Sequence, residues 1–494
     1  MRSYITNKRK YLLYFYILLF IGCIYLVRRY DHIVPTTNRK SLDLSRSNNN
    51  SPITNPIKFT KKAEFPLICP PNKTTQKCPT NNYPTTINDY DEKQNSSSSS
   101  SSIESCPDYF RWIHEDLNPW KVKGITEEIV EEGKNEAFFR IIILDGRLYV
   151  EKYQKSYKKR DDFTIWGILQ LLRLYPGKLP DLDLMFGSGD KTVINKSDYE
   201  GDYPVPMFQY SGDDEHFDIP FPDWSFWGWP ESNIKPWEVQ LEEMKNGNKN
   251  VKWEKRKPFA YWKGNSKLGN RKNLLKCNST RSKTQIFEQL STLEDRDDLK
   301  QSDIDDQCTF RYNIYMEGKA WSMNEKYLHA CDSMLLIVEP KSYEFFSRGL
   351  LPLTHYWPIN PSKLCESIKF AVNWGNKYRD QAQEIGKEGS KFIMEELKMR
   401  YIYDYMYHLL SEYGKLMKYR PSIPSNAIEI CSEAMACNTI GKEKKWKFDS
   451  LIKAPSQTSP CSLPSAYHPQ ILKKFLSTKQ EISRDVEGLE GVGL

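Results

Sequence analysis

Residues 326–354 read KYLHACDSMLLIVEPKSYEFFSRGLLPLT, and this stretch decides the expected fold. The apolar run over Ser333–Val338 predicts a buried strand, and the residues before it, Lys326–Cys331, predict a helix. A short helix over Ser342–Arg348 and a second strand over Leu350–Thr354 are expected to follow. Strands that alternate with helices in this way predict βαβ units with a parallel sheet, and therefore an α/β protein.

Further elements are expected outside this stretch. An Asp-Gly dipeptide is a favoured two-residue hairpin turn, and apolar residues at i, i+3, i+4 and i+7 indicate a helix. The expected elements are a hairpin over 137–153 that turns at Asp145-Gly146, an amphipathic helix through Ile165, Ile168, Leu169 and Leu172 that ends at Pro176-Gly177, a strand over Leu182–Phe186, a short strand over Phe259–Trp262 and one long helix over Arg379–Met417. The residues after this long helix carry no pattern that assigns them.

The length and charge of the chain narrow its class. At 494 residues it exceeds what one hydrophobic core usually supports, so two domains with appendages are expected. The net charge of +7 is spread along the chain, and the Lys-rich pieces alternate with aromatic or acidic residues. This pattern favours solvated basic surfaces over a nucleic-acid partner. The sequence has no His-X-Glu or Cys-X-X-Cys metal spacing, and no Ser-His-Asp arrangement that would indicate a hydrolase.

Residues 11–27, YLLYFYILLFIGCIYLV, form a long uncharged apolar run. As a helix this run would span about 25 Å, near the short end of a membrane crossing. Basic residues flank it on both sides and no small-residue cleavage site follows, so we expect an uncleaved signal anchor rather than a cleaved signal peptide. The basic head suits the cytosol, which places the large remainder in the lumen.

Sequons and cysteines agree with a lumenal body. Asn-X-Ser/Thr sequons occur at Asn49, Asn72, Asn95, Asn195 and Asn278. Of eleven cysteines, Cys23 lies in the apolar run and the others allow up to five disulfides in an oxidising compartment, with Cys69 and Cys78 able to close a small loop. The last residues carry no Lys-Asp-Glu-Leu signal, so we expect the Golgi rather than the endoplasmic reticulum.

The segment Gln209–Glu231 combines acids, prolines and glycines with Trp224, Trp227 and Trp229. Indole faces can stack on the C–H face of a sugar ring, while nearby polar groups such as Asp218 bind its hydroxyls. The alternative is an aromatic cluster that fills a domain interface. Composition alone leaves both interpretations open.

Other residues could carry chemistry. Asp190 follows the strand Leu182–Phe186 in a glycine-bearing loop, where a carboxylate can take a proton from an attacking hydroxyl or can simply cap a turn. The turn over 262–271, with Arg271, could hold a diphosphate through N–H groups and charge, or could be structural. Asp181-Leu182-Asp183 resembles a carboxylate motif that holds a metal–nucleotide complex, although strand alternation also lets both acids face outward. His216, His329 and His355 are interpreted as structural.

Several segments together resemble the Rumi-type protein O-glucosyltransferase family, also called capsule-associated-protein-like glycosyltransferases, and most of all its plant branch. The matching segments are Cys106-Pro-Asp-Tyr-Phe, Leu179–Phe186, Phe221–Trp229, Tyr261–Asn265, Glu317–Trp321, Glu325–Ser333, Phe345–Arg348 and His355–Ile359. The resemblance covers about Cys106 to Lys415.

The resemblance implies inverting, metal-independent transfer from a UDP-sugar by two Rossmann-like domains that face a cleft, the GT-B arrangement. It implies Asp190 as the catalytic base and no cofactor besides the donor. The implied nucleotide-sugar contacts are Gly264, Asn265, Ser266, Arg271, Ser322, Asn324 and Lys326. The implied contacts to the acceptor or the sugar are Asp218, Trp224 and Trp227.

Two departures from the family pattern stand out. Plant relatives usually carry Asp-Cys-Asp-Asp where this chain has Gly187-Ser188-Gly189-Asp190, and Thr192 replaces a usual Pro, which predicts a looser and less acidic loop. Animal members carry Arg where Asn324 stands, and Lys326 is expected to supply the missing diphosphate contact.

The expected organisation follows from these points. It comprises a cytosolic tail (1–10), a transmembrane anchor (11–27), a disordered lumenal stem (28–105), an acceptor-side Rossmann-like domain (106–255), a nucleotide-sugar domain (256–378), a closing helix (379–420) and a tail (421–494). The expected function is transfer of glucose or xylose to a protein or polysaccharide hydroxyl. The rival interpretations are a pseudoenzyme that binds UDP-sugar or glycan, and a membrane-anchored interaction protein without activity.

Overall fold

The computed structural model describes residues 104–199, 203–279, 283–289 and 304–492, together with Phe65, Leu67, Cys69 and Cys78. The predicted tail, anchor and nearly all of the stem lie outside these residues, as do the sequons at Asn49, Asn72 and Asn95. Among the helices that are described, none combines the length and the apolar character that crossing a bilayer needs.

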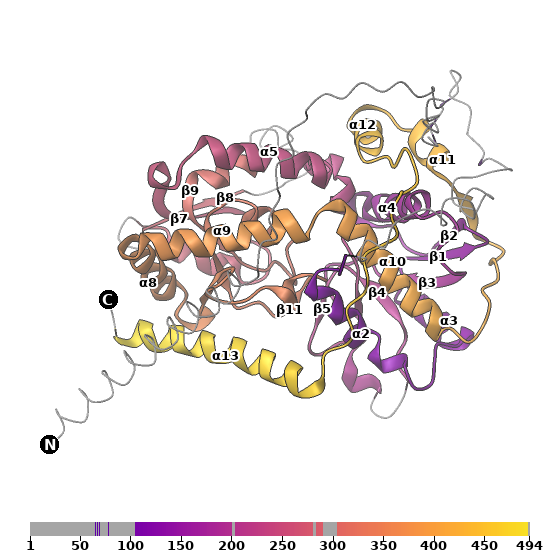
Figure 1. Ribbon diagram of the computed structural model, residues 1–494, viewed down its shortest axis with the longest axis horizontal. Coiled ribbons are helices and arrows are strands. Elements are labelled where there is room, and N and C mark those ends of the chain that lie inside the picture. The colour runs from indigo at the N-terminus through magenta and orange to yellow at the C-terminus, as the bar shows by residue number, and fades with distance from the viewer. Residues whose placement is uncertain are drawn as a thin grey trace, which may run out of the picture. The chain divides into compact units, whose positions relative to one another are not determined.

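The first sheet has six strands in the order β13-β2-β1-β3-β4-β6. Its strands β2, β1, β3 and β4 are labelled in Figure 1. Its strands are β1 (Phe139–Leu144), β2 (Arg147–Lys152), β3 (Leu182–Phe186), β4 (Met207–Gln209), β6 (Ile219–Pro220) and β13 (Ile428–Ile430). The predicted hairpin and strand are confirmed. Asp145 and Gly146 turn between β1 and β2 with φ of 49° and 72°, as a primed two-residue turn requires. The sheet is mixed, because β1 pairs antiparallel with β2 and β3 while β3, β4 and β6 are parallel.

The second sheet is entirely parallel, with the order β12-β10-β9-β7-β8. Its strands are β7 (Lys257–Gly264), β8 (Thr284–Glu288), β9 (Phe310–Tyr315), β10 (Met334–Val338) and β12 (Trp357–Ile359). Every residue of β10 is buried, as expected of a strand that is covered on both faces. The parallel sheet and the helix before β10, α7 (Asn324–His329), confirm the predicted α/β character.

Two predicted elements after β10 are wrong. Ser342–Arg348 is not a helix: Ser342–Tyr343 forms β11, which pairs antiparallel with β5 (Gly212–Asp213), and a short 3-10 turn follows at Ser347–Gly349. The strand predicted over Leu350–Thr354 lies later in the chain, as β12. Both errors have the same cause. The pairing of β11 with β5 and of β12 with β10 determined the structure here, rather than the local apolar pattern.

The remaining helices surround the two sheets. They are α2 (Trp112–Asp116), α3 (Glu127–Glu132), α4 (Arg160–Leu174), α5 (Trp237–Asn250), α8 (Leu364–Lys377), α9 (Arg379–Glu396), α10 (Met399–Leu416), α11 (Ser432–Cys437), α12 (Gly441–Asp449) and α13 (Pro469–Val492). The predicted amphipathic helix is α4, and it is buried over nearly its whole length. The predicted long helix is instead the two helices α9 and α10, separated at Leu397, whose carbonyl accepts a hydrogen bond of 2.8 Å from Trp237 Nε1.

The C-terminal residues that carry no sequence pattern have a definite structure. They contribute β13 to the first sheet, and they form α11, α12 and the 24-residue α13 (Figure 1). Val486 of α13 is buried in the hydrophobic core of the second sheet.

The described cysteines form five disulfides, the number that the cysteine count allows. They join Cys69 to Cys437, Cys78 to Cys431, Cys106 to Cys461, Cys277 to Cys365 and Cys308 to Cys331. The small loop proposed between Cys69 and Cys78 is therefore wrong. Each of these cysteines pairs with the C-terminal region more than 350 residues away, and sequence spacing gives no sign of such a pairing.

Candidate functional site

Asp190 lies in the loop that follows β3. Its Oδ1 accepts a hydrogen bond of 2.7 Å from Nη1 of Arg160, the first residue of α4. The Asp190 side chain is 41% exposed, whereas the Arg160 side chain is 10% exposed. Among the described residues, no group donates to Asp190 Oδ2. One oxygen of this carboxylate is therefore anchored, and the other is open to an incoming group.

The loop around Asp190 is held by residues of the segment Gln209–Glu231. Gln209 donates to the Lys191 carbonyl at 3.0 Å, and Asp213 accepts from the Thr192 hydroxyl at 2.6 Å. Asp218 accepts the backbone N–H groups of Val193 and Ile194. The loop predicted to be looser is thus fastened by side chains on its C-terminal side.

Asp218 is itself 94% buried, so it does not contact an acceptor as predicted. Burial raises the pKa of its carboxyl to about 6, against the opposing effect of the two backbone N–H groups. The prediction failed because a carboxylate in a polar segment can accept hydrogen bonds either from a ligand at the surface or from backbone N–H groups inside the protein. The sequence does not distinguish these partners.

Trp224 and Trp227 are also buried, at 1% and 0% exposure, so neither offers a face to a sugar. Trp227 donates to Tyr403 at 3.0 Å, and Trp224 lies under the Arg160 guanidinium, 4.2 Å from ring centroid to Cζ. Both rings therefore pack inside the protein, as the alternative of an aromatic cluster requires; that this cluster fills a domain interface stays a prediction. The exposed aromatic side chain close to Arg160 is Tyr157, which the sequence analysis missed.

A small polar hollow lies at the second sheet, where β7 and β9 end. Ligands of open α/β sheets bind at this carboxyl edge. Three predicted residues line the hollow, namely Arg271, Ser322 and Asn324. Tyr261, Lys263, Gln307 and Tyr315 line it too and were not among the predicted contacts. Tyr261 and Lys263 lie in a segment that carries the family resemblance, whereas Gln307, in a 3-10 turn before β9, has no sequence signal.

Arg271 is held in place by backbone carbonyl groups of a segment distant in sequence. Its Nε donates to the carbonyls of Met316 and Glu317 at 3.1 and 2.9 Å, and burial lowers its pKa. This anchoring directs a guanidinium to the hollow without a carboxylate partner among the described residues. A buried, unpaired cation favours an anionic ligand.

The other residues of the predicted nucleotide loop stabilise the turn itself. Asn265 accepts the backbone N–H of Lys267 at 2.9 Å, and the Ser266 hydroxyl binds the Glu288 carboxylate. Gly264 packs against Trp262, with space for a Cβ only 2.9 Å from that ring. These three residues adjoin the hollow through β7 but do not line it.

Lys326 is not a diphosphate contact. Its ammonium group is fully buried, donates to Asp223 Oδ2 at 2.8 Å and lies 4.6 Å from the Phe226 ring centroid. Attraction to Asp223 and Glu344 raises its pKa in spite of burial, which lowers it. The prediction placed this lysine on the correct helix. Its side chain points into the protein rather than toward the hollow.

A chain of aromatic contacts links Asp190 to the hollow. Arg160 lies over Trp224, and Trp224 is 5.8 Å from Trp321, measured between ring centroids. The residue after Trp321 is Ser322, which lines the hollow. The pairing of β5 with β11 fastens the same two regions. These contacts connect the loop of Asp190, on the first sheet, with the segment that carries Ser322 to the hollow, on the second.

The acids of the Asp181-Leu182-Asp183 motif are both used in ion pairs. Asp183 is fully buried and binds Arg140 through two hydrogen bonds of 2.7 and 2.6 Å. Asp181 binds Arg420 at 2.9 Å. The expectation that both acids can face outward is wrong for Asp183, which is buried, and each of the two carboxylates has its own arginine partner.

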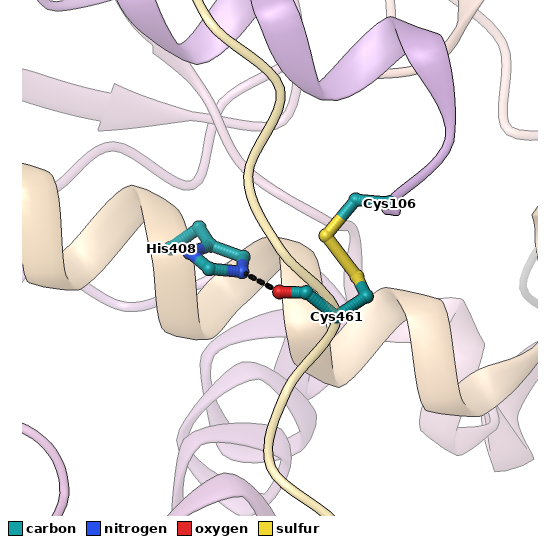
Figure 2. Close-up of side chains that lie close together, drawn as sticks. All are labelled: Cys106, His408 and Cys461. Carbon is teal, nitrogen blue, oxygen red and sulfur yellow. Dashed lines mark hydrogen bonds between the residues drawn. A yellow bond between two sulfur atoms is a disulfide. The ribbon is translucent and has the colours of Figure 1, made fainter. Parts of the chain in front are cut away.

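One further cluster of metal-ligand type occurs among the described residues, at Cys106, His408 and Cys461. Figure 2 shows that the two sulfur atoms are bonded to each other and that the His408 ring faces the Cys461 carbonyl oxygen. His408 Nε2 is 2.7 Å from that oxygen. Sulfur atoms joined in a disulfide are not thiolate ligands. The cluster is a disulfide with a neighbouring histidine.

The mixed α/β fold, with a polar hollow at the carboxyl edge of a parallel sheet, is consistent with that of a Rossmann-like glycosyltransferase. A model of glycosyl transferase family 90 matches residues 101–490, and the chain belongs to this family. The match includes most of the C-terminal residues that carry no sequence pattern. The chain is thus a Rumi-type glycosyltransferase.

Curated relatives agree with the family. The chain is 26% identical over 329 residues to the O-glucosyltransferase rumi homolog of Aedes aegypti. The aligned part makes up 64% of this chain and 80% of that protein. It is 27% identical over 339 residues to protein O-glucosyltransferase 1 of Homo sapiens, covering 64% and 82%. It is 25% identical over 328 residues to O-glucosyltransferase rumi of Drosophila melanogaster, covering 64% and 78%.

Proposed function

We propose that this chain moves a sugar from a UDP-sugar to a hydroxyl group, with inversion at the anomeric carbon and without a metal ion, and that Asp190 is the general base. The observation that carries the proposal is a carboxylate with one anchored and one open oxygen, linked by packing to the polar hollow. The two sheets and their helices would form the halves of a GT-B arrangement, with the donor on the second half.

The mechanism follows from the chemistry of these groups. Asp190 Oδ2 takes the proton of the acceptor hydroxyl while that oxygen attacks the anomeric carbon from the face opposite UDP. The new C–O bond forms as the bond to the diphosphate oxygen breaks, and UDP leaves with the electron pair. Arg271 and Lys263 offset the charge that develops on the diphosphate, and Ser322 and Asn324 donate hydrogen bonds to it.

A reaction without a metal ion is supported by the ion pairs that the acidic side chains of the Asp181-Leu182-Asp183 motif form. Asp181 and Asp183 are paired with arginines, and the cations that line the hollow supply positive charge at the expected position of the diphosphate. Lewis-acid assistance is therefore not needed for the leaving group in this proposal.

The names of the relatives support glucose as the sugar and a protein as the acceptor, with xylose as the second choice of sugar and a polysaccharide as the second choice of acceptor. We propose the Golgi membrane as the location, with a single-pass anchor at residues 11–27 and the catalytic part in the lumen; the endoplasmic reticulum is the alternative. Five disulfides fit such an oxidising compartment.

The test is a donor screen with the purified full-length chain, scored by UDP release from several UDP-sugars with and without added acceptor proteins. We expect one donor to be strongly preferred, and we expect Asp190→Asn to lower its turnover by about 10²- to 10⁴-fold while melting behaviour is retained. Turnover that persists in Asp190→Asn would refute the assignment of the base. A UDP-induced thermal shift without turnover would indicate the pseudoenzyme, and the absence of both would indicate an interaction protein.

A further inference from the structure

We infer that Arg160 is the positioning residue of the reaction: it fixes the direction in which the Asp190 carboxylate presents its free oxygen to the acceptor. This inference rests on the proposed function, because it takes Asp190 to be the base. It assigns a role to a residue on the first turn of α4 that none of the short segments quoted for the resemblance includes.

The geometry of the pair gives Arg160 this role. Nη1 of Arg160 and Oδ1 of Asp190 are 2.7 Å apart, and among the described residues Arg160 is the one side chain that donates to this carboxylate. Asp190 follows Gly189, where an added Cβ would meet no atom closer than 3.9 Å apart from its chain neighbours, so no other side chain packs against the loop at this point. An exposed carboxylate in such a loop keeps one orientation only if a second group holds it.

The guanidinium is held in turn by a cage of aromatic rings. Its Cζ lies 4.2 Å from the ring centroid of Trp224, 5.1 Å from that of Tyr157 and 5.6 Å from that of Trp229. Contacts of this kind fix the plane of an arginine side chain as well as its position. The cage also explains the composition of the aromatic segment, since Trp224 and Trp229 support a cation rather than a sugar.

The backbone before Arg160 shows that this placement is imposed. Lys158 and Lys159 both adopt left-handed conformations, with φ of 47° and 57°. Such conformations are unfavourable for residues with a Cβ, and they persist only where surrounding structure enforces them. Arg160 Nε is in addition buried without an acceptor among the described residues. Strain and an unsatisfied donor are tolerated together at a position where the side chain's direction matters.

The experiment measures UDP-sugar turnover by the full-length chain, with the donor that the screen identifies. Arg160→Met should lower kcat by about 10- to 100-fold and change the KM for the UDP-sugar less than about twofold, because misplacement of a reacting group acts on the chemical step. Millimolar guanidinium chloride should restore part of kcat in Arg160→Ala. A merely structural role would not give this rescue.

Two further variants keep the inference falsifiable. Arg160→Lys retains a cation over Trp224 but not the planar fork, so it should fold and lose about 3- to 10-fold in kcat. Lys158→Met is the matched control, since Lys158 also lies over Trp229, at 5.7 Å, without binding Asp190. This control should keep the kcat of the wild-type chain.

Each outcome has a distinct meaning. Folded Arg160 variants with unchanged kcat, in a chain that loses turnover in Asp190→Asn, would overturn the inference and leave the proposed function intact. An equal loss of kcat in Lys158→Met would also overturn it, because it would show a general effect of the turn. If Asp190→Asn keeps its turnover, or no UDP-sugar is turned over at all, the proposed function fails and the inference fails with it.

Discussion

Replacing Lys326 by methionine should destabilise the protein strongly without acting directly on donor binding. Methionine keeps the unbranched apolar stem and removes the ammonium group that lies 2.8 Å from Asp223 Oδ2. Both side chains of this pair are 0% exposed. In the variant, Asp223 must either stay ionised without a partner or take up a proton, next to Glu344, whose pKa burial already raises well above its ordinary value.

The expected magnitude follows from the burial of both partners. Removing one member of a buried, hydrogen-bonded ion pair destabilises a protein by about 3–5 kcal/mol. An unfolding entropy of about 2.1 cal/mol/K per residue over roughly 400 folded residues gives about 0.8 kcal/mol/K at Tm. The expected decrease in Tm is therefore about 4–6 °C.

A double-mutant cycle separates the lost pair from other effects. Asp223→Asn keeps an acceptor for the Ser225 backbone N–H, which Asp223 Oδ1 binds at 2.7 Å, and removes the negative charge. The double variant Asp223→Asn with Lys326→Met should therefore recover at least about 2 kcal/mol relative to Lys326→Met alone. Scanning calorimetry and urea unfolding of all four proteins measure the cycle.

The same experiment tests whether Lys326 binds the diphosphate. Lys263→Met, which changes a residue that lines the hollow, is the control and should reduce the UDP-induced thermal shift while leaving Tm in the absence of UDP unchanged. If Lys326→Met behaves like Lys263→Met, with an unchanged Tm and a lost response to UDP, our reasoning from burial is refuted.

Three further predictions concern stability. Gly167→Ala should destabilise by about 1–2 kcal/mol in urea, because its Cβ would lie 2.4 Å from an indole ring, whereas Gly247→Ala in open space should stabilise by about 0.5–1 kcal/mol. Burial lowers the pKa of His329 from 6.5 to about 3, so the folded state resists protonation and stability should fall from pH 6.5 toward pH 3, by about 2 kcal/mol at pH 5; His329→Asn should flatten this dependence in pH-dependent urea melts. Removing the Cys106–Cys461 disulfide with a double serine variant should cost about 2–5 kcal/mol by calorimetry.

Local chemistry made parts of the fold predictable. The β1–β2 hairpin follows from its Asp-Gly turn, and β10 follows from a continuous apolar run. In both cases the residues that determine the element lie within it. β11 and β12 were not predictable in this way, since β11 has two residues and β12 three, and each exists because a strand from elsewhere in the chain lies beside it.

The residues of the candidate site also fall into two groups, those that local motifs indicate and those whose role depends on distant contacts. Arg271, Ser322 and Asn324, which the resemblance implies as donor contacts, all line the hollow, because short motifs on one strand end or turn stay together when the chain folds. It could not give the direction of Lys326, or show that Asp218 binds backbone N–H groups. These outcomes depend on which groups the rest of the protein brings within hydrogen-bond distance.

The sequence by itself determined the class of this protein, since turn chemistry, apolar periodicity and family motifs are all local properties of the chain. The tertiary structure alone decided which acids are structural and which is open. Asp183, Asp218 and Asp223 are buried against distant partners, while Asp190 keeps one oxygen free of any described donor. The physical reason is that burial and charge pairing are set by contacts between residues far apart in sequence, and no local pattern records them.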